Sequence, residues 1–472
     1  MKLTKNFFFI SFILSCLFIF LRLEIVFGSD TKAPFTDDFY YYLTTAKNFK
    51  NFGIVSFDQI SLTNGYQPLW FLIILTFKYF VNNDLTLNIL IIFTIFFLSL
   101  LVFFNFKNYL IQCKYTEEES VFISSLISYL TLFFSKNGME AALAVFLFSS
   151  SILYLNKNIV IFSFLGFLTF LSRLEFIFVY LIILSNEVFL KKKILNYNYI
   201  LKLSIFPLLL IIYVLVNIYF FNLPFPESGI AKSLAKELKF NDQTFSFLMS
   251  GSNGMKFISL LFYINCIGIL FIFSNKTKIF TKILLISVLI FFLSNSLRSP
   301  WPLWTWHFIF LAISTPLLLN DLLNYSNKKL FKFLTGCISI FFLSSYFYLF
   351  QKDINAKSDH ILNLANQITS YYQFSDNKIF AMGDMAGKTS YLLNKKLIQL
   401  EGLVSGKNMI NNIKSERNLC SVLKEYKVDV YLASRIERKD SVINLREPSL
   451  KSKNIKRMKG TINSQPNKVF KS

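Results

Sequence analysis

The sequence predicts an α-helical polytopic membrane protein with about eleven transmembrane helices, followed by a small α/β domain outside the membrane. Three observations support this prediction. Hydrophobic residues make up 54% of the 472 residues, the mean hydropathy is +0.49, and these residues gather in long runs. Most lysines and arginines stand in the short connections between the runs and near the C-terminal end. After residue 352, short β-like runs alternate with helical stretches, which is typical of an α/β domain.

A helix needs about 20 apolar residues to cross a membrane. The candidate runs are 6–27, 68–81, 85–104, 120–135, 139–155, 158–190, 200–221, 256–273, 279–296, 302–319 and 330–350. The first run is too long for a removed signal peptide and lacks a good cleavage site, so we expect it to remain as a span. The topology between 68 and 190 stays open, because two arrangements fit the flanking segments and place Glu140 on different sides.

The net charge of +22 could suggest a nucleic-acid partner, but its distribution argues for none. Lysines at 191–193, 276–282 and 328–332 all fall between spans two apart, so the three groups can face the cytoplasm together. We therefore expect the N-terminus inside the cell. Residues 28–67, 222–255, 297–304 and everything after 352 are then outside.

Three regions follow along the chain. We expect a transmembrane domain over 1–352 with its first outer loop at 28–67, a small α/β extracytoplasmic domain over 353–434, and a basic tail over 435–472 that is disordered or held at an anionic lipid surface. No two of the five cysteines have metal-site spacing, so no metal ligands are predicted. A requirement for a divalent metal stays open.

The first outer loop contains an acid pair, Asp37 and Asp38, directly after Thr36. Thr36 suits a helix N-cap, carboxylates suit the first turn, and Gly53 suits the stop, so we predict a helix between them. Apolar residues at helical spacing indicate that it lies on the membrane surface. Helix capping alone would explain the acids about as well as chemistry does.

Ionisable residues inside or beside apolar runs are candidates for a site, because burying them in a membrane is costly. Arg173 and Glu175 interrupt one run and could equally be a mutual ion pair. Lone histidines such as His307 are more often interfacial residues among tryptophans. The candidates are Glu140, Arg173, Glu175, Lys232, Arg298 and His307. A carboxylate base and cations near a phosphate leaving group would suit transfer to a hydroxyl.

Five stretches, in order, resemble bacterial glycosyltransferases of the GT-C class, the polytopic enzymes that use polyprenyl-phosphate sugars. They are TDDFYYYLTTAKNF…LTNGYQPLW, NGMEAALAVFL, FLTFLSRLEFIFV, PFPESGIAKS and GDMAGKTSYLLNKKLIQLEGLV. Together they extend from about residue 36 to 432. Three departures bear mainly on substrate choice: Phe39 follows the acid pair, Ala141 replaces a threonine, and Gln399-Leu400-Glu401 replaces an Asp-Leu pattern.

The resemblance implies a GT-C fold and an inverting transfer of a hexosyl or pentosyl group, as in mannosyl- and arabinosyltransferases. It implies a bacterial inner membrane location, with the catalytic face outside. The catalytic carboxylates would be Asp37, favoured as the general base, and Asp38. Substrate-binding residues would be Tyr66, Gln67, Glu140, Arg173, Glu175, Lys232, Arg298 and His307. The lipid-linked sugar would be the donor, and the acceptor would be a glycan, a lipid or a protein.

Two other functions compete with this one. A transporter or flippase of a lipid-linked sugar would often show an internal repeat of broken helices, and no duplicated segment is found. A non-catalytic envelope assembly protein would not need the acids of the first loop, although that argument rests on the resemblance. The sequence does not identify the sugar, the acceptor or the oligomeric state.

Overall fold

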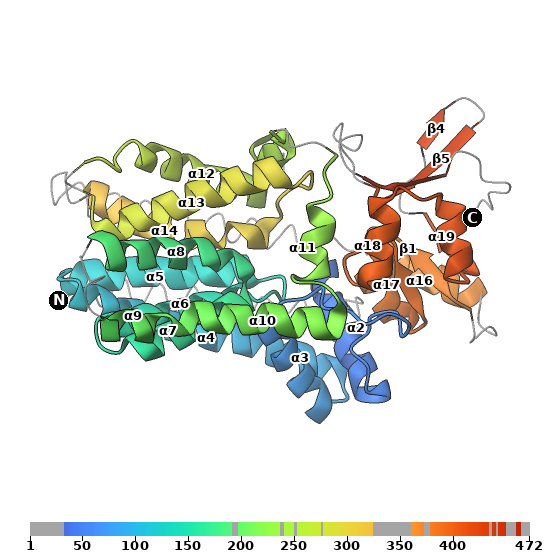
Figure 1. The fold of residues 1–472 in the computed structure, drawn as a ribbon, viewed down its shortest axis with the longest axis horizontal. Coiled ribbons are helices and arrows are strands. Elements are labelled where there is room, and N and C mark those ends of the chain that lie inside the picture. The colour runs from blue at the N-terminus through green and yellow to red at the C-terminus, as the bar shows by residue number, and fades with distance from the viewer. Residues whose placement is uncertain are drawn as a thin grey trace.

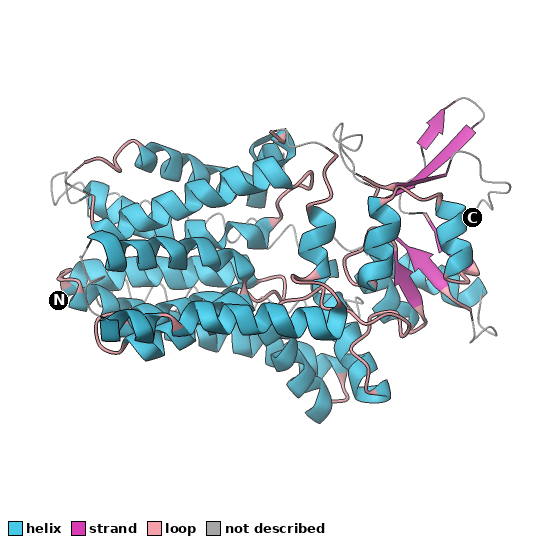
Figure 2. Ribbon diagram, in the orientation of Figure 1, coloured by secondary structure: helices cyan, strands magenta, loops and turns pink. Residues whose placement is uncertain are grey.

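The protein is described from a computed structural model and consists mainly of helices, with two small sheets (Figures 1 and 2). The structure describes residues 33–190, 197–236, 240–249, 253–274, 277–323, 360–371, 378–433, 437–439, 442–449 and 459–463. The expected first and last spans, 6–27 and 330–350, lie outside these residues. A bundle of long helices forms one part of the molecule and the α/β domain forms the other (Figure 1).

The expected apolar runs between 85 and 323 are helical and pack side by side along the bundle (Figure 1). The bundle helices are α4 (Asp84–Gln112), α5 (Glu117–Ser135), α6 (Ala141–Tyr154), α7 (Ile159–Ser172), α8 (Ile177–Ser185), η2 (Asn186–Leu190), α9 (Tyr197–Leu203), α10 (Ile205–Phe221), η4 (Asp242–Met249), α12 (Asn253–Ile269), α13 (Ile279–Arg298), η5 (Thr305–Phe308) and α14 (Ile309–Leu323). Three helical stretches are long and apolar enough to cross a membrane, namely Asp84–Gln112, Tyr197–Phe221 and Ile279–Arg298. The protein is therefore membrane-associated.

Polar contacts define one end of the bundle, which we call the distal end. The backbone N–H of Lys278 donates to Asp321 Oδ2 at 3.0 Å, and Thr281 donates to the same oxygen at 2.7 Å. The Lys278 ammonium lies over the ring of Tyr115. The start of α5, the start of α13 and the end of α14 therefore meet at the distal end.

The opposite end, which we call the site end, gathers the connections that follow α5, α7 and α13. Asn137 donates to Thr305 at 3.1 Å, and Arg173 forms an ion pair with Glu140 at 3.1 Å. Asn241 donates to the carbonyl of Ser299. The chain thus runs back and forth between the two ends, and Glu140, whose side was open in the sequence, lies at the site end.

The arrangement of two of the expected apolar runs comes from the structure. Run 68–81 forms α3 (Pro68–Phe80), which lies along helix α2 (Asp37–Phe52): Lys50 of α2 donates to Lys78 O and Asn82 Oδ1 near the end of α3, and Tyr42 accepts from Gln67 N at its start. Run 158–190, which Ser172-Arg173 splits in the sequence, forms two helices, α7 and α8. The chain turns at Arg173 and η1 (Leu174–Phe176), and α8 returns along α7, with Thr169 and Tyr180 hydroxyls 3.1 Å apart.

The expected α/β domain is present. The three short β-like runs, expected at 378–382, 397–400 and 428–432, form strands, which pair as a parallel sheet in the order β2-β1-β3. Helices pack around this sheet, and α17 lies outside the helical stretches 354–373 and 410–426 that the sequence predicts. The elements are α16 (His360–Tyr371), β1 (Phe380–Met382), α17 (Ala386–Leu393), β2 (Leu397–Gln399), α18 (Gly406–Lys414), α19 (Leu419–Glu425) and β3 (Val430–Leu432).

The prediction of a disordered tail is wrong for its described part. Strands β4 (Glu437–Lys439), β5 (Val442–Glu447) and β6 (Thr461–Asn463) form an antiparallel sheet. Glu447 of β5 is buried and accepts a hydrogen bond from Tyr431 Oη at 2.8 Å. This contact joins the second sheet to β3 of the first sheet, so the tail completes the α/β domain despite its many charges.

Candidate functional site

The acid pair begins helix α2, as the sequence predicts. Thr36 has the extended backbone of an N-cap, Asp37 and Asp38 occupy the first turn, and Gly53 ends the helix with a left-handed φ of 71°. The N–H of Gly53 donates to Phe49 O at 2.8 Å, which closes the last turn. Thr36 makes no side-chain cap, and the two carboxylates stand in the first turn, where the helix dipole favours negative charge.

The surroundings of α2 differ from a helix lying on a membrane surface. Residues on every side of the helix are buried, including Phe39, Tyr40, Tyr41, Tyr42 and Leu43. The helix lies at the junction of the bundle and the α/β domain, where it contacts α3 on one side and α17 on another (Figure 1). Its aromatic residues therefore serve protein packing, which explains why four of them can follow each other directly.

Asp37 is held by the α/β domain. The N–H of Lys388 donates to its Oδ1 at 2.7 Å and the N–H of Gly387 to its Oδ2 at 3.3 Å, both from the first turn of α17, and the Tyr41 hydroxyl donates to the same carboxylate. Burial, with the negative charges of Asp38 and Asp384, raises the pKa of Asp37 to about 7, against the lowering effect of these hydrogen bonds. Asp37 thus joins two regions that are 350 residues apart.

Asp38 has a different environment. It is half-buried, and its carboxylate has no hydrogen bond within the described part of the chain. Burial raises its pKa above the ordinary 3.8, Asp384 adds to that rise, and the nearby ammonium of Lys232 opposes it. Of the two acids, Asp38 therefore keeps its oxygens open for an incoming hydroxyl group.

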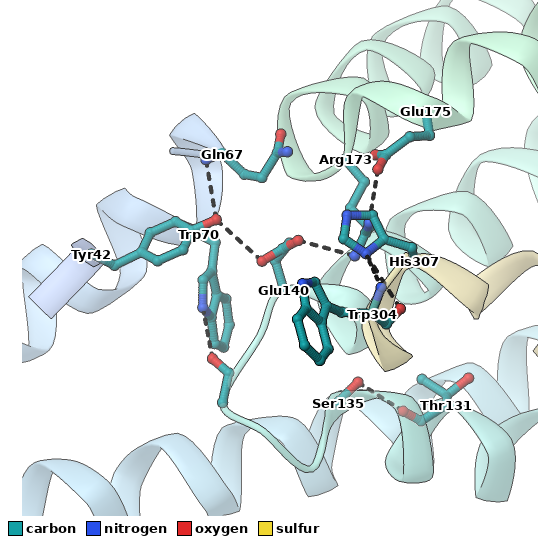
Figure 3. A network of polar contacts seen from close by, with 11 residues as sticks. Tyr42, Gln67, Trp70, Thr131, Ser135, Glu140, Arg173, Glu175, Trp304 and His307 are labelled. Atoms are coloured by element: carbon teal, nitrogen blue, oxygen red, sulfur yellow. Dashed lines mark hydrogen bonds and ion pairs between the residues drawn. The ribbon is translucent and has the colours of Figure 1, made fainter. Parts of the chain in front are cut away.

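A buried polar network lies beside the acid pair at the site end (Figure 3). Arg173 binds Glu140 at 3.1 Å and Glu175 at 2.8 Å, and Arg173 and Glu140 are both only 2% exposed. The Tyr42 hydroxyl donates to the second oxygen of Glu140 at 3.2 Å. The expected Arg173–Glu175 pair exists and includes Glu140 as a third member. Tyr42 connects this triad to α2, one turn after Asp38.

Tyr66 and Gln67, the two predicted substrate-binding residues just before α3, have different surroundings. The backbone N–H of Gln67 donates to Tyr42 Oη at 3.2 Å, and its side-chain Oε1 is buried without a partner among the described residues. Figure 3 shows the Gln67 side chain extending toward the Arg173 network. Tyr66 instead stacks on Phe71 of α3, with ring centroids 4.2 Å apart, and so fixes the end of the first outer loop to this helix.

The three expected outer-loop cations do not form one cluster. Lys232, the last residue of α11 (Glu227–Lys232), is close enough to Asp38, Glu401 and His307 to shift the pKa of each. Burial and the charges of Lys232 and Arg173 lower the pKa of His307 to about 3, so His307 is neutral. Arg298 is exposed at the end of α13, and no contact links it to the acid pair in the described ranges.

Several site residues were not predicted from the sequence. Tyr41 and Tyr42 are not among the predicted site residues, and the amides of α17 were not expected to bind Asp37. Asp384, whose charge acts on both acids, and Glu401, on which the charge of Asp37 acts, lie in the stretch GDMAGKTSYLLNKKLIQLEGLV. That stretch is one of the five that carry the resemblance, but Glu401 was noted there only as a departure from an Asp-Leu pattern.

Within the described residues, no group of three or more His, Cys, Asp and Glu side chains could hold a metal ion. The described residues of the site offer carboxylates, the ammonium of Lys232, the guanidinium of Arg173, hydroxyl groups and backbone amides. The chain matches no protein-family model and no curated protein sequence.

Proposed function

We propose that this protein is an inverting membrane glycosyltransferase that moves a sugar from a polyprenyl phosphate to an acceptor hydroxyl. One observation supports this most: Asp38, a carboxylate with open oxygens, lies near the ammonium of Lys232 where the apolar bundle meets a polar domain. A lipid-phosphate donor needs a hydrophobic path for its chain and a cation for its phosphate. The acceptor needs a base for its proton.

In this proposal Asp38 is the general base. Its carboxylate takes the proton of the acceptor hydroxyl while the oxygen forms a bond to the anomeric carbon from the face opposite the phosphate. The bond between that carbon and the phosphate oxygen breaks, and the polyprenyl phosphate leaves as an anion near Lys232. A phosphate leaving group carries its charge without protonation, so a neutral His307 is no obstacle.

Asp37 takes a positioning role, which differs from the expectation that it is the base. Its oxygens already accept hydrogen bonds from two amides of α17 and from Tyr41. The Glu140–Arg173–Glu175 triad holds Tyr42, and therefore the same turn of α2, from the other side. The base is thus fixed between two rigid supports, which is what a reaction dependent on orientation requires.

We further infer that the chain crosses the bacterial plasma membrane about eleven times, with the site end outside. The alternation between site end and distal end supports nine crossings between residues 84 and 323, from α4 to α14, with α8–η2 and α9–α10 each taken as one. The apolar runs at 6–27 and 330–350 would supply two more. The lysines of the distal end then face the cytoplasm, as loop lysines usually do.

The proposal is tested with purified full-length Asp38→Asn and Asp37→Asn variants. Each is given polyprenyl-phosphate hexoses and pentoses, together with an envelope extract as the source of acceptor, and released polyprenyl phosphate is measured. We expect Asp38→Asn to lower the rate by about 10²–10⁴-fold, since that is typical for the loss of a positioned base. Asp37→Asn keeps one accepting oxygen toward Lys388 and should retain more activity than Asp38→Asn.

Both variants must first elute as monodisperse protein with unchanged helical content. Normal turnover by a folded Asp38→Asn protein would reject Asp38 as the base. A larger loss in Asp37→Asn than in Asp38→Asn would return that role to Asp37. Wild-type protein that releases no polyprenyl phosphate from any of these donors would reject the transferase itself.

A further inference from the structure

We propose that a cleft between the first outer loop, the end of α10 and the α/β domain binds the phosphate-bearing headgroup of an anionic membrane lipid. The cleft has a volume of about 630 Å³, within the range of ligand sites. It contains none of the residues assigned to the transferase site, and the inference does not depend on that function.

The membrane-facing side of the cleft is apolar. Ile60 and Leu62 at the tip of the first outer loop are 49% and 52% exposed, and Phe220 at the end of α10 is 58% exposed. The stretch Tyr197–Phe221 is long and apolar enough to span a membrane, and most of it is not covered by protein. The cleft therefore opens where a lipid-facing helix ends, which is the depth of lipid headgroups.

The opposite side of the cleft is positively charged. Lys407 and Lys427 both line it, are exposed, and have no ion-pair partner within the described residues. The acid that also lines it, Glu425, forms an ion pair with Arg417 and is therefore neutralised. An anionic ligand fits this balance of two unpaired lysines and one paired acid. Lys427 also has a left-handed φ of 54°, a conformation more usual for glycine or asparagine.

Polar groups between the two lysines also suit a phosphate. Helix α18 begins at Gly406, and Lys407 and Asn408 follow in its first turn. The side chain of Ser405, the N-cap, is turned away to bond the backbone of Gln399. The N–H of Gly406 donates to Glu227, whereas the amides of Lys407 and Asn408 receive no side-chain cap from Ser405. Asn408 is exposed and also lines the cleft, and its side-chain amide can donate to a phosphate.

The shape of the cleft is set by close packing at Gly406. This residue has a left-handed φ of 80°, and a Cβ there would lie 3.1 Å from both Leu62 O and Ser61 Cβ. The loop tip therefore rests directly on the start of α18. The apolar side and the positively charged side of the cleft therefore face each other, which suits a lipid with an acyl chain and an anionic headgroup.

The test uses the full-length protein in detergent and native mass spectrometry with added lipid. Phosphatidylglycerol is the anionic probe and phosphatidylcholine the zwitterionic one. The double variant Lys407→Ala/Lys427→Ala should weaken phosphatidylglycerol retention by about tenfold or more, because each basic residue near a lipid surface contributes to binding. The control Lys414→Ala/Lys424→Ala removes the same charge from exposed lysines that do not line the cleft, and should behave as wild type.

Equal losses in the cleft variant and its control would overturn the proposal, since they would indicate a general charge effect. Retention of phosphatidylcholine equal to that of phosphatidylglycerol would also overturn it. Displacement of the lipid by millimolar inorganic phosphate would show a site for free phosphate and would equally reject a lipid headgroup site.

Discussion

At the scale of single residues, the cations Lys232 and Arg298 differ in their surroundings. Lys232 acts on the carboxylate of Asp38, whereas Arg298 is exposed at the end of α13. We expect Lys232→Ala to raise the KM for a lipid-phosphate donor by about tenfold or more, because a cation paired with an anion in a partly enclosed site contributes more than an exposed pair. Lys232→Arg should restore part of this loss.

Arg298→Ala is the matched control and should leave donor KM within about twofold of wild type, as is usual for an exposed charge. Steady-state kinetics at varied donor concentration measure both variants. If Arg298→Ala raised KM as much as Lys232→Ala, the donor phosphate would have to lie nearer the end of α13 than the acid pair.

The site residues differ in how far the sequence could predict them. Asp37 and Asp38 follow an N-cap residue, and Arg173 interrupts an apolar run, so local pattern and membrane cost pointed to all three. Of their partners, only Glu175 beside Arg173 was expected; Glu140 and the groups that bind Asp37 were not. The amides of Gly387 and Lys388 reach Asp37 across 350 residues of chain, and no periodicity carries that information.

At the scale of elements, two glycines allow the α/β domain to dock. A Cβ on Gly387 would overlap the backbone carbonyl of Asp37, and one on Gly65 would overlap that of Leu403. Gly387→Ala and Gly65→Ala should therefore each destabilise the folded protein by about 1–3 kcal/mol, as overpacking does. Alanine favours a helix over glycine, so a loss at Gly387, in α17, would come from docking and not from the helix itself.

Gly229 of α11 provides the control, because nothing lies within 4 Å of a Cβ added there. Thermal unfolding of the three variants, with hydrogen exchange of the α17 amides, checks this prediction. Gly229→Ala should unfold like the wild type. Unchanged unfolding and exchange in Gly387→Ala would mean that α17 does not pack on α2 as described.

At the scale of the whole molecule, the two ends of the bundle should lie on opposite sides of the membrane. Cys113 is exposed at the end of α4, on the distal side, and Ser421 is exposed in the α/β domain. In intact cells, a membrane-impermeant maleimide should label a single cysteine introduced by Ser421→Cys. A protein retaining only Cys113 should react after permeabilisation alone. Labelling of Cys113 in intact cells would reverse or reject the proposed orientation.

Glu227 joins three distant parts of the molecule and makes stability depend on pH. Its side chain bonds Thr63 of the first loop, it accepts from the Gly406 N–H of α18, and its own N–H donates to Asn64 at 3.0 Å. Burial, with the charge of Asp58, raises its pKa from 4.5 to about 8 despite these bonds. The folded protein therefore binds a proton that the unfolded chain has lost between these two pH values.

Stability should accordingly fall as pH rises from about 4.5 to 8, by up to about 1.4 kcal/mol per pH unit for one proton. Glu401 and Glu447, whose pKa values are also raised, act in the same direction. The measured quantity is therefore the difference between wild type and Glu227→Gln in unfolding experiments from pH 5 to 8.5. Parallel curves for the two proteins would show that Glu227 ionises normally.

The sequence by itself determined the helices of the bundle, the helix that starts at Asp37, and the short strands after residue 378. Each of these depends on local periodicity, capping or composition. The length of an apolar run sets the length of its helix and therefore the thickness of membrane that the helix can cross. Composition alone did not predict that the basic tail forms a sheet. The packing of α3 along α2 and the return of α8 along α7 after Arg173 also come from tertiary contacts.

Only the tertiary structure decided how the site is assembled. It surrounds α2 on all sides, gives Asp37 its hydrogen bonds from α17, leaves Asp38 open beside Lys232, and separates Arg298 from both. The physical reason is that hydrogen bonds and charge interactions act over a few ångströms in space, between side chains that can be hundreds of residues apart. Which acid is buried, bonded or free therefore follows from the packing of distant elements.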